Sequence, residues 1–228
     1  MISFRTLVTS VLFAAIFSSH GAAQDLSKYR GFEFGMGIES VAKLADVNPS
    51  AARTVHQRPE MIQTLDWELH GYFDASPTAD SVRNIRFDFY NGELSKIVAT
   101  YDTTQTRGLT ADDLVEAISA VYGPARNPES SINVSGLLTY NGDQQVLARW
   151  ENTQYSYNLF LSSYGMSFGL VAFSKRLDLM ASIARREAER LDDLEAPARE
   201  GARLKKQEED DLAAQMKARQ ISKPKFRP

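Results

Sequence analysis

The stretch IRFDFYNGELSKIVATYD, residues 85–102, has the pattern of two β-strands joined by a tight turn. Side chains alternate between the two faces of a strand, so the length of the turn decides whether the apolar residues of both strands share a face. A two-residue Asn-Gly turn would place Phe87 opposite Lys96 and split the apolar residues between the faces. A three-residue loop that ends at Gly92, in a left-handed bulge, gathers them on one face. We therefore predict a bulged hairpin in which Phe87 and Ile97 point inward.

The outward face of this hairpin carries charged and large apolar side chains together. Charged residues on a solvated sheet form only weak ion pairs. Apolar residues beside them make the face more adhesive than solvation requires. Three interpretations follow: a plain solvated sheet, a surface for a partner protein, or a face covered by a helix. The candidate partner-binding residues are Arg86, Asp88, Tyr90, Leu94, Lys96 and Val98.

Residues 1–23 have the pattern of a secretory signal peptide. Arg5 precedes an apolar run over residues 7–17, and Gly21 and Ala23 fit the small residues that precede a signal peptidase cleavage site. The apolar run is too short to span a bilayer comfortably. We expect cleavage near Ala23 and a periplasmic or secreted protein with no transmembrane span after cleavage.

The composition excludes several classes of site. The chain has no Cys, which rules out thiol nucleophiles, thiolate zinc sites and iron–sulfur clusters. Residues 25–174 contain 11 Lys and Arg against 18 Asp and Glu, whereas residues 175–228 contain 14 against 11. Because the main part of the chain is acidic, we expect no nucleic-acid partner.

Two helices are predicted in the main part of the chain. The first is short, covers residues 38–44, and ends before Asn48-Pro49. The second begins at Thr110, whose side chain suits an N-cap, and stops at Gly123-Pro124. Its predicted buried stripe consists of Leu114, Val115, Ile118 and Val121.

The remaining strands repeat the order of the first half. Strands are predicted at residues 61–70, 145–150, 155–162 and 167–175, with Tyr164-Gly165 turning the last pair. Two units, residues 29–105 and 106–174, thus each contain a helix, a strand with Trp (Trp67, Trp150) and a hairpin. We predict an α+β domain over residues 24–174, in which two helix-plus-antiparallel-strand units form a curved antiparallel sheet with helices on one face.

Residues 175–219 predict a long, charged C-terminal helix. Its apolar positions follow helical spacing but are mostly alanine: Leu177, Ala181, Ala184, Ala188 and Leu191. Pro197 either kinks or ends this helix. The helix either docks on the domain by its first turns or serves as a coiled-coil or partner-binding arm. Residues 220–228 are basic and are predicted to form a flexible tail.

The segment GLTADDLVEAISAVYGPA, residues 108–125, resembles the opening helix of the BamE (SmpA/OmlA) family of outer-membrane assembly proteins. Residues 34–44 resemble a more degraded copy of the same motif. A tandem of such units is similar in outline to the β-lactamase inhibitory proteins, in which helices cover one side of a curved antiparallel sheet. The whole chain resembles a group of uncharacterised secreted bacterial proteins that begin YRGF and end in KPxFRP. The chain departs from the BamE family in having no lipidated cysteine and in its long C-terminal helix.

The sequence contains no catalytic fingerprint such as HExxH, GxSxG or a phosphate-binding loop. Asp66, Glu68 and His70 share one face of a predicted strand, which could seat a metal for a hydrolase, but the pattern is more typical of the solvated face of a half-buried strand. We therefore expect a non-enzymatic module that binds another envelope or secreted protein, without cofactor or metal. The alternatives are the hydrolase and a structural oligomer formed through the C-terminal helix.

Overall fold

The computed structural model describes residues 25–68, 81–126, 131–133, 143–162, 167–225 and 227. The predicted signal peptide, His70 and the predicted Tyr164-Gly165 turn lie outside these residues. The main sheet contains β3 (Arg53–His56), β4 (Ile62–Glu68), β5 (Val82–Tyr90), β6 (Glu93–Tyr101), β7 (Ser131–Asn133), β8 (Asp143–Glu151), β9 (Tyr155–Leu161) and β10 (Phe168–Ser174). The other elements are the short strands β1 (Lys28–Tyr29) and β2 (Phe32–Glu33), the helices α1 (Ile38–Leu44), α2 (Ala111–Tyr122) and α3 (Lys175–Ser222), and the 3₁₀ turns η1 (Pro49–Ala51) and η2 (Lys223–Lys225).

The main sheet has eight strands in the order β3-β4-β5-β6-β10-β9-β8-β7, and every pairing is antiparallel. Each half of the sheet holds four consecutive strands, and the last strand of each half, β6 or β10, lies at the centre. In the sequence, α1 precedes the first four strands and α2 precedes the second four. Both helices contribute to one hydrophobic cluster that spans the two halves. The predicted α+β architecture of two helix-plus-antiparallel-strand units is therefore confirmed.

The turn of the β5–β6 hairpin differs from the prediction. Tyr90 pairs with Glu93 across a two-residue turn made of Asn91 and Gly92. The φ angles of these two residues are 48° and 81°, and such positive values at both positions are typical of a type I′ turn. The predicted three-residue loop is therefore wrong.

A bulge in β6 keeps the apolar residues of this hairpin on one face. The register shifts between Leu94 and Lys96, so Ser95 is an extra residue and Phe87 lies opposite Ile97. The Ser95 hydroxyl donates to the buried carbonyl oxygen of Asp88 over 2.9 Å. Phe87 and Ile97 point inward as predicted. The same shift turns Leu94 into the inner cluster, so its predicted outward position is wrong.

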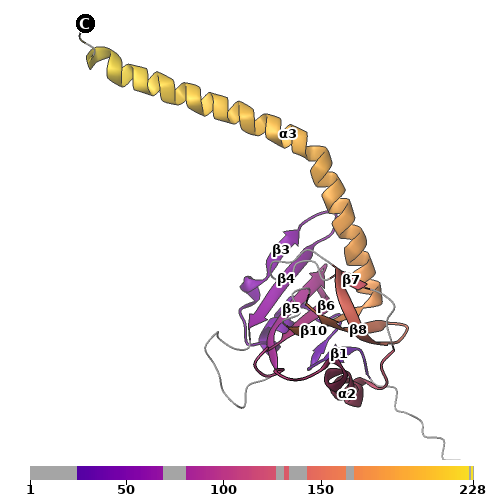
Figure 1. Cartoon of the computed structure of the whole chain (residues 1–228). Helices are drawn as coiled ribbons and strands as arrows, with labels where there is room; N and C mark the ends of the chain where they lie inside the picture. Colours follow the sequence, from indigo (N-terminus) through magenta and orange to yellow (C-terminus); the bar gives the residue numbers. More distant parts are fainter. Residues whose placement is uncertain are drawn as a thin grey trace, which may run out of the picture.

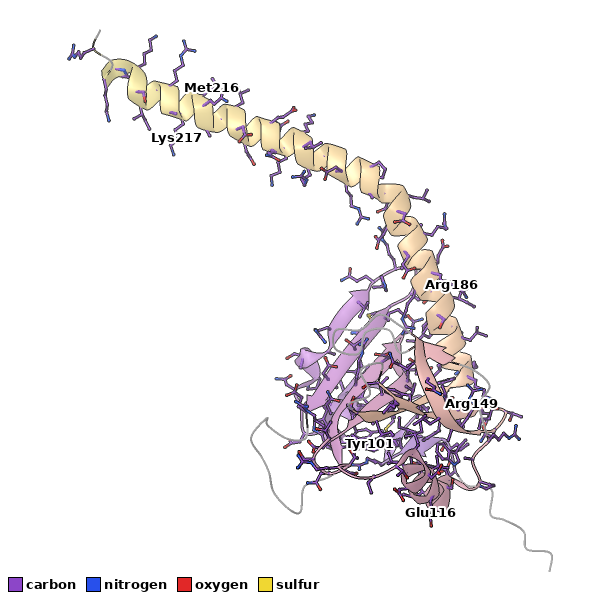
Figure 2. The ribbon with its side chains drawn as sticks, viewed as in Figure 1. Tyr101, Glu116, Arg149, Arg186, Met216 and Lys217 are labelled. Atoms are coloured by element: carbon purple, nitrogen blue, oxygen red, sulfur yellow. The ribbon has the colours of Figure 1, made fainter. Side chains whose placement is uncertain are left out.

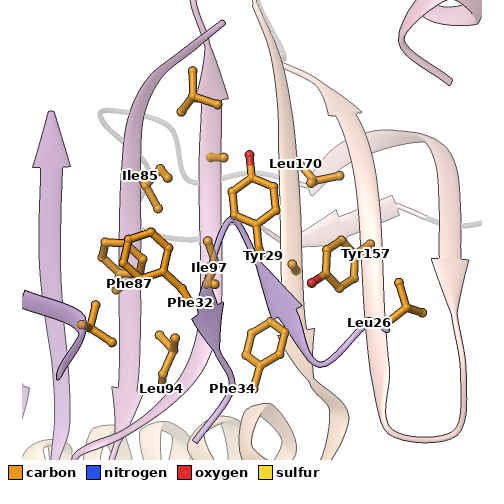
Figure 3. Close-up of a cluster of buried hydrophobic side chains, with 14 of the residues drawn as sticks. Leu26, Tyr29, Phe32, Phe34, Ile85, Phe87, Leu94, Ile97, Tyr157 and Leu170 are labelled. Carbon is orange, nitrogen blue, oxygen red and sulfur yellow. The ribbon is translucent and has the colours of Figure 1, made fainter. Parts of the chain in front are cut away.

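The β1–β2 hairpin fills the inner face of the sheet. Figure 3 shows its side chains among Ile85, Phe87 and Ile97. The rings of Phe32 and Phe87 lie 4.6 Å apart between centroids, and Phe34 stacks on Tyr155 at 5.5 Å. Burial of this many aromatic side chains gives a domain without disulfides a substantial core.

The inner face is closed at one end by α2. Its N-terminus has the predicted Thr110 cap, completed by a capping box with Asp113. The Trp150 indole N–H donates to the Gly123 carbonyl oxygen at 2.9 Å, which ties the end of the helix to β8. Leu114 is buried as predicted, but Val121 is 59% exposed because Tyr122 turns toward the sheet in its place and packs on Tyr157.

The third helix covers the opposite face of the sheet. Its N-cap is Ser174, the last residue of β10, so the chain passes from sheet to helix without a loop. Of the predicted stripe, Leu177, Ala181, Ala184 and Ala188 are buried and Leu191 is half-buried. The helix continues through Pro197 to Ser222, beyond the predicted end at residue 219. Figure 1 shows α3 bending as it leaves the body of the protein and then projecting away from it.

Candidate functional site

Part of the predicted partner surface on β5 and β6 lies beneath α3, which contacts Asp88, Tyr90 and Lys96. Val98 instead packs with Phe160 and Val171 of the neighbouring strands. Asp88, Tyr90 and Val98 are buried, at 4%, 9% and 3% exposure, and the side chains of Arg86 and Lys96 are 18% and 15% exposed. Leu94 belongs to the opposite face. Of the three interpretations of the outward face, the structure shows the one with a covering helix. An external partner could reach Asp88, Tyr90 and Lys96 only by displacing α3.

An ionic seam fixes α3 on the sheet. The Lys96 ammonium lies 2.6 Å from the Asp178 carboxylate of α3, and the pair is mostly buried. Asp88 accepts a hydrogen bond from the Arg86 guanidinium at 2.9 Å and lies 3.9 Å from Arg185 of α3. Because each charge in the seam faces an opposite charge, the predicted outward residues serve intramolecular packing.

A small apolar cluster lies next to this seam. Ile62 of β4 and Tyr90 of β5 pack on Leu177, Ala181 and Ala184 of α3. Alanine side chains let the helix backbone approach the sheet closely and lose no rotamer entropy on burial. The thin alanine stripe is therefore enough to dock the first part of α3.

Farther along, α3 is held by the loop between β3 and β4. Both amino groups of the Arg58 guanidinium donate to the Glu195 carboxylate, at 2.7 and 2.5 Å. This bidentate contact raises the pKa of Arg58 and lowers that of Glu195, because each ion stabilises the charge of the other. It lies two residues before Pro197 and marks the last contact of α3 with the body among the described residues.

The predicted metal face is not assembled in the part of the chain that the structure describes. Asp66 forms an ion pair with Arg53 of the neighbouring strand β3, which occupies its carboxylate. Glu68 is exposed, and His70 lies outside the described residues. No group of three His, Asp or Glu side chains within the described ranges could hold a metal ion.

Tyr157 is a fully buried ionisable residue of the inner core, and Tyr122 is half-buried beside it. Burial raises the pKa of the Tyr157 hydroxyl, and the neighbouring Tyr122 adds to this effect. The rings of these two residues lie 4.7 Å apart between centroids. Both hydroxyls stay protonated at neutral pH, so they are suited to packing and not to abstracting a proton.

An apolar surface that was not predicted from the sequence lies on the solvent side of α3. Leu179, Met180 and Ile183 are 59%, 37% and 53% exposed, although each is large and apolar. We call these three residues the α3 patch. Leu179 and Ile183 lie on the side of the helix opposite the buried alanines, and Met180 lies between them and the docked side. The signal that reveals the patch is the i, i+4 spacing of Leu179 and Ile183.

Two arginines flank the α3 patch. Arg176 is exposed, and its guanidinium lies 3.6 Å from the Met180 sulfur and 4.0 Å from the Glu93 carboxylate. Arg186 is exposed, points away from the sheet in Figure 2, and forms no ion pair with the described residues. The surface thus combines an apolar centre with two arginines at its edge, on a helix that is fixed to the sheet.

Beyond Pro197 the helix is exposed on all sides. We call residues 198–225 the arm. The Arg199 guanidinium donates to the Asp192 carbonyl oxygen at 2.8 Å and to its carboxylate at 3.1 Å, which bridges the bend on both sides of Pro197. Glu200 and Arg203 form a further pair at 2.6 Å. Such contacts between neighbouring turns support a helix that has no packing partner.

Comparison with protein-family models, with curated proteins and with solved structures finds no match to this chain. The resemblance to the BamE family and to the β-lactamase inhibitory proteins therefore stays an expectation. In the described ranges, no helix has both the length and the hydrophobicity needed to cross a membrane.

Proposed function

We propose that the protein is a non-enzymatic interaction module of the periplasm or the extracellular space, and that another protein docks on the α3 patch. The exposure of Leu179, Met180 and Ile183 carries this proposal. Large apolar side chains that form one contiguous exposed patch often mark an interaction site, whereas single exposed apolar residues are common on any protein surface. The docked part of α3 presents them on a rigid support, so binding costs little conformational entropy.

The charges around the patch indicate the chemistry of the partner. Two copies of this chain packed antiparallel, with Leu179 facing Ile183, would place Arg176 opposite Arg186. Like charges in direct opposition cost several kcal/mol. We therefore propose a different protein as the partner, with an apolar stripe bordered by carboxylates.

The test compares a patch variant with a matched control. A photo-crosslinking residue at Ser182, beside the patch, identifies the partner in envelope extract. Leu179→Gln together with Ile183→Gln should lower capture of that partner at least about tenfold, since two apolar contacts are lost. Leu204→Gln together with Leu212→Gln changes two similarly exposed residues of the arm and should leave capture unchanged.

Three outcomes would overturn the proposal. Equal capture by the patch variant and the control would remove the patch as the site. A crosslink to a second copy of the chain would assign the surface to an oligomer. Undiminished capture after Arg186→Glu would contradict a partner with carboxylates at this rim.

Export is part of the proposal and has its own test. It is supported by the signal-peptide pattern of residues 1–23. The chain recovered from the periplasm or medium should begin just after Ala23, as read by N-terminal sequencing. Recovery of an intact Met1 from the cytoplasm would contradict export.

A further inference from the structure

The end of the arm carries a concentrated positive charge. Between Leu212 and Arg227 the chain contains five basic residues and no Asp or Glu. The basic residues are Lys217, Arg219, Lys223, Lys225 and Arg227, and all are exposed. Figure 2 shows Lys217 near the far end of the helix, remote from the sheet.

Several of these groups converge on one place. Arg219, Ser222, Lys223 and Lys225 line an open hollow beside the end of α3. Arg219 and Lys223 are four residues apart, which puts them on the same side of the helix. Arg219, Lys223 and Lys225 therefore lie close enough together to act jointly on anionic groups at a surface.

The apolar residues of the arm do not form a helix-binding face. Leu212 and Met216, four residues apart, share one side of the helix over a single turn. At about 100° per residue, Ile221 points to the side opposite Leu212, and Leu204 lies about 80° from Leu212. A coiled coil needs apolar residues that repeat along one stripe. The pair Leu212 and Met216 covers one turn and is not continued by Leu204 or Ile221, so charge is the dominant means of contact at the end of the arm.

The acidic body of the molecule is too distant to neutralise this end. About 25 residues of helix follow Pro197, which corresponds to about 40 Å. The screening length at physiological ionic strength is about 8 Å. The acidic body is many screening lengths away, and even the acidic run at residues 208–211 lies about 9 Å or more along the helix from Lys217.

We propose that the end of the arm docks on the surface of an anionic phospholipid bilayer. A flat array of phosphate headgroups suits five cations at the tip of a helix whose hollow is open and whose apolar residues form no continuous stripe for a shaped partner. Each Lys or Arg near an anionic bilayer contributes enough attraction to raise binding about fivefold. The arm then holds the acidic body about 40 Å from a surface that would repel it.

The experiment measures flotation of the chain that begins at Gln24, which contains every described element, with lipid vesicles. Vesicles of phosphatidylcholine mixed with phosphatidylglycerol should bind the protein, and vesicles of phosphatidylcholine alone should not. Raising the salt concentration should release it, because the attraction is electrostatic. The variant Lys217→Gln, Arg219→Gln, Lys223→Gln should lower partitioning about a hundredfold.

The control neutralises three other cations of the arm, with Arg203→Gln, Lys205→Gln and Lys206→Gln. Its partitioning should fall by less than about fivefold, since these residues lie far from the tip. Circular dichroism checks that both variants keep their helix content. Equal losses in the two variants, binding to neutral vesicles, or full competition by soluble polyglutamate would overturn the proposal, and the last result would assign the tip to acidic proteins. The α3 patch lies on another part of the helix, so its partner capture should survive the tip variant.

Discussion

Replacing Gly169 with Ala tests how closely the central strands are packed. Gly169 of β10 lies opposite Phe160 of β9 and Thr100 of β6. The ring of Phe160, only 4% exposed, covers the glycine: a Cβ atom built there would lie 2.2 Å from Cζ of Phe160 and 3.0 Å from the carbonyl oxygen of Ala99. Neither separation is tolerated without movement of the surrounding atoms.

Two opposing effects set the expected size of the change. Gly to Ala within a strand alone should stabilise by about 0.5–1 kcal/mol through reduced chain entropy. Forcing extra volume into a packed site costs about 1–3 kcal/mol, and loss of most of the contacts of a buried Phe costs about 3–5 kcal/mol. Since the ring must leave its place, we expect Gly169→Ala to lower the free energy of unfolding by about 2 kcal/mol.

Urea denaturation followed by tryptophan fluorescence measures this change. The same substitution in a Phe160→Leu background should cost at least about 1 kcal/mol less, because the clashing ring atoms are gone. Part of the cost should remain through the carbonyl oxygen of Ala99. A Gly169→Ala protein as stable as the wild type, or an identical cost in both backgrounds, would refute the proposed packing of Phe160 over the glycine.

Three further changes test the helices. Asp178→Asn should lower the free energy of unfolding by about 1–2 kcal/mol in urea titrations, because Lys96 loses its mostly buried partner; no change would contradict the ionic seam. Hydrogen bonds from the Thr110 backbone and side chain lower the pKa of Asp113, so its contribution is present above the unfolded pKa and is lost as pH falls through the folded pKa. Asp113→Asn should therefore lower the melting temperature near neutral pH but not near about pH 2, and a pH-independent difference would refute this linkage. Pro197→Ala should straighten α3 and raise helix content, seen as a longer maximum dimension in small-angle scattering, and an unchanged dimension would place the cause of the bend elsewhere.

The elements that sequence predicted well are those with strong local signals. The α2 helix begins at a capping residue and ends before Gly123, and both signals act within one turn. The two faces of β5 follow from the alternation of apolar and polar residues. These patterns depend on neighbouring residues only, so they can be recognised without the tertiary structure.

The turn of the central hairpin could not be predicted in this way. Asn91-Gly92 is a strong type I′ signal, but it contradicts the alignment of apolar residues unless one strand carries an extra residue. Ser95 supplies that residue, and its hydroxyl bonds to the carbonyl oxygen of Asp88. Nothing local distinguishes this serine from one in a regular strand, so the pattern favoured the wrong loop.

The covered face was ambiguous for a different reason. Arg86, Asp88 and Lys96 fit a solvated sheet as well as an ionic seam. The residue type alone does not tell whether a charged side chain is exposed to solvent or buried in an ion pair. The partner Asp178 is separated from Lys96 by about eighty residues of sequence. The apolar Tyr90 and Val98 on that face, together with the alanine stripe of α3, were the signals that favoured a covering helix.

α3 has two parts that differ in their contacts: the part before Pro197 packs on the sheet, and the arm after Pro197 does not. Its alanines allow close approach to the sheet, and the pairs Lys96–Asp178 and Arg58–Glu195 hold it at both ends of the contact. Since these contacts all lie before Pro197, the helix up to that point is part of the rigid body, and the α3 patch shares its rigidity. The arm beyond has no such contacts among the described residues, so its direction depends on the bend alone. A partner on the α3 patch would therefore bind a surface that is fixed relative to the sheet. A bilayer would instead bind the tip of the arm, whose direction relative to the sheet depends on the bend at Pro197.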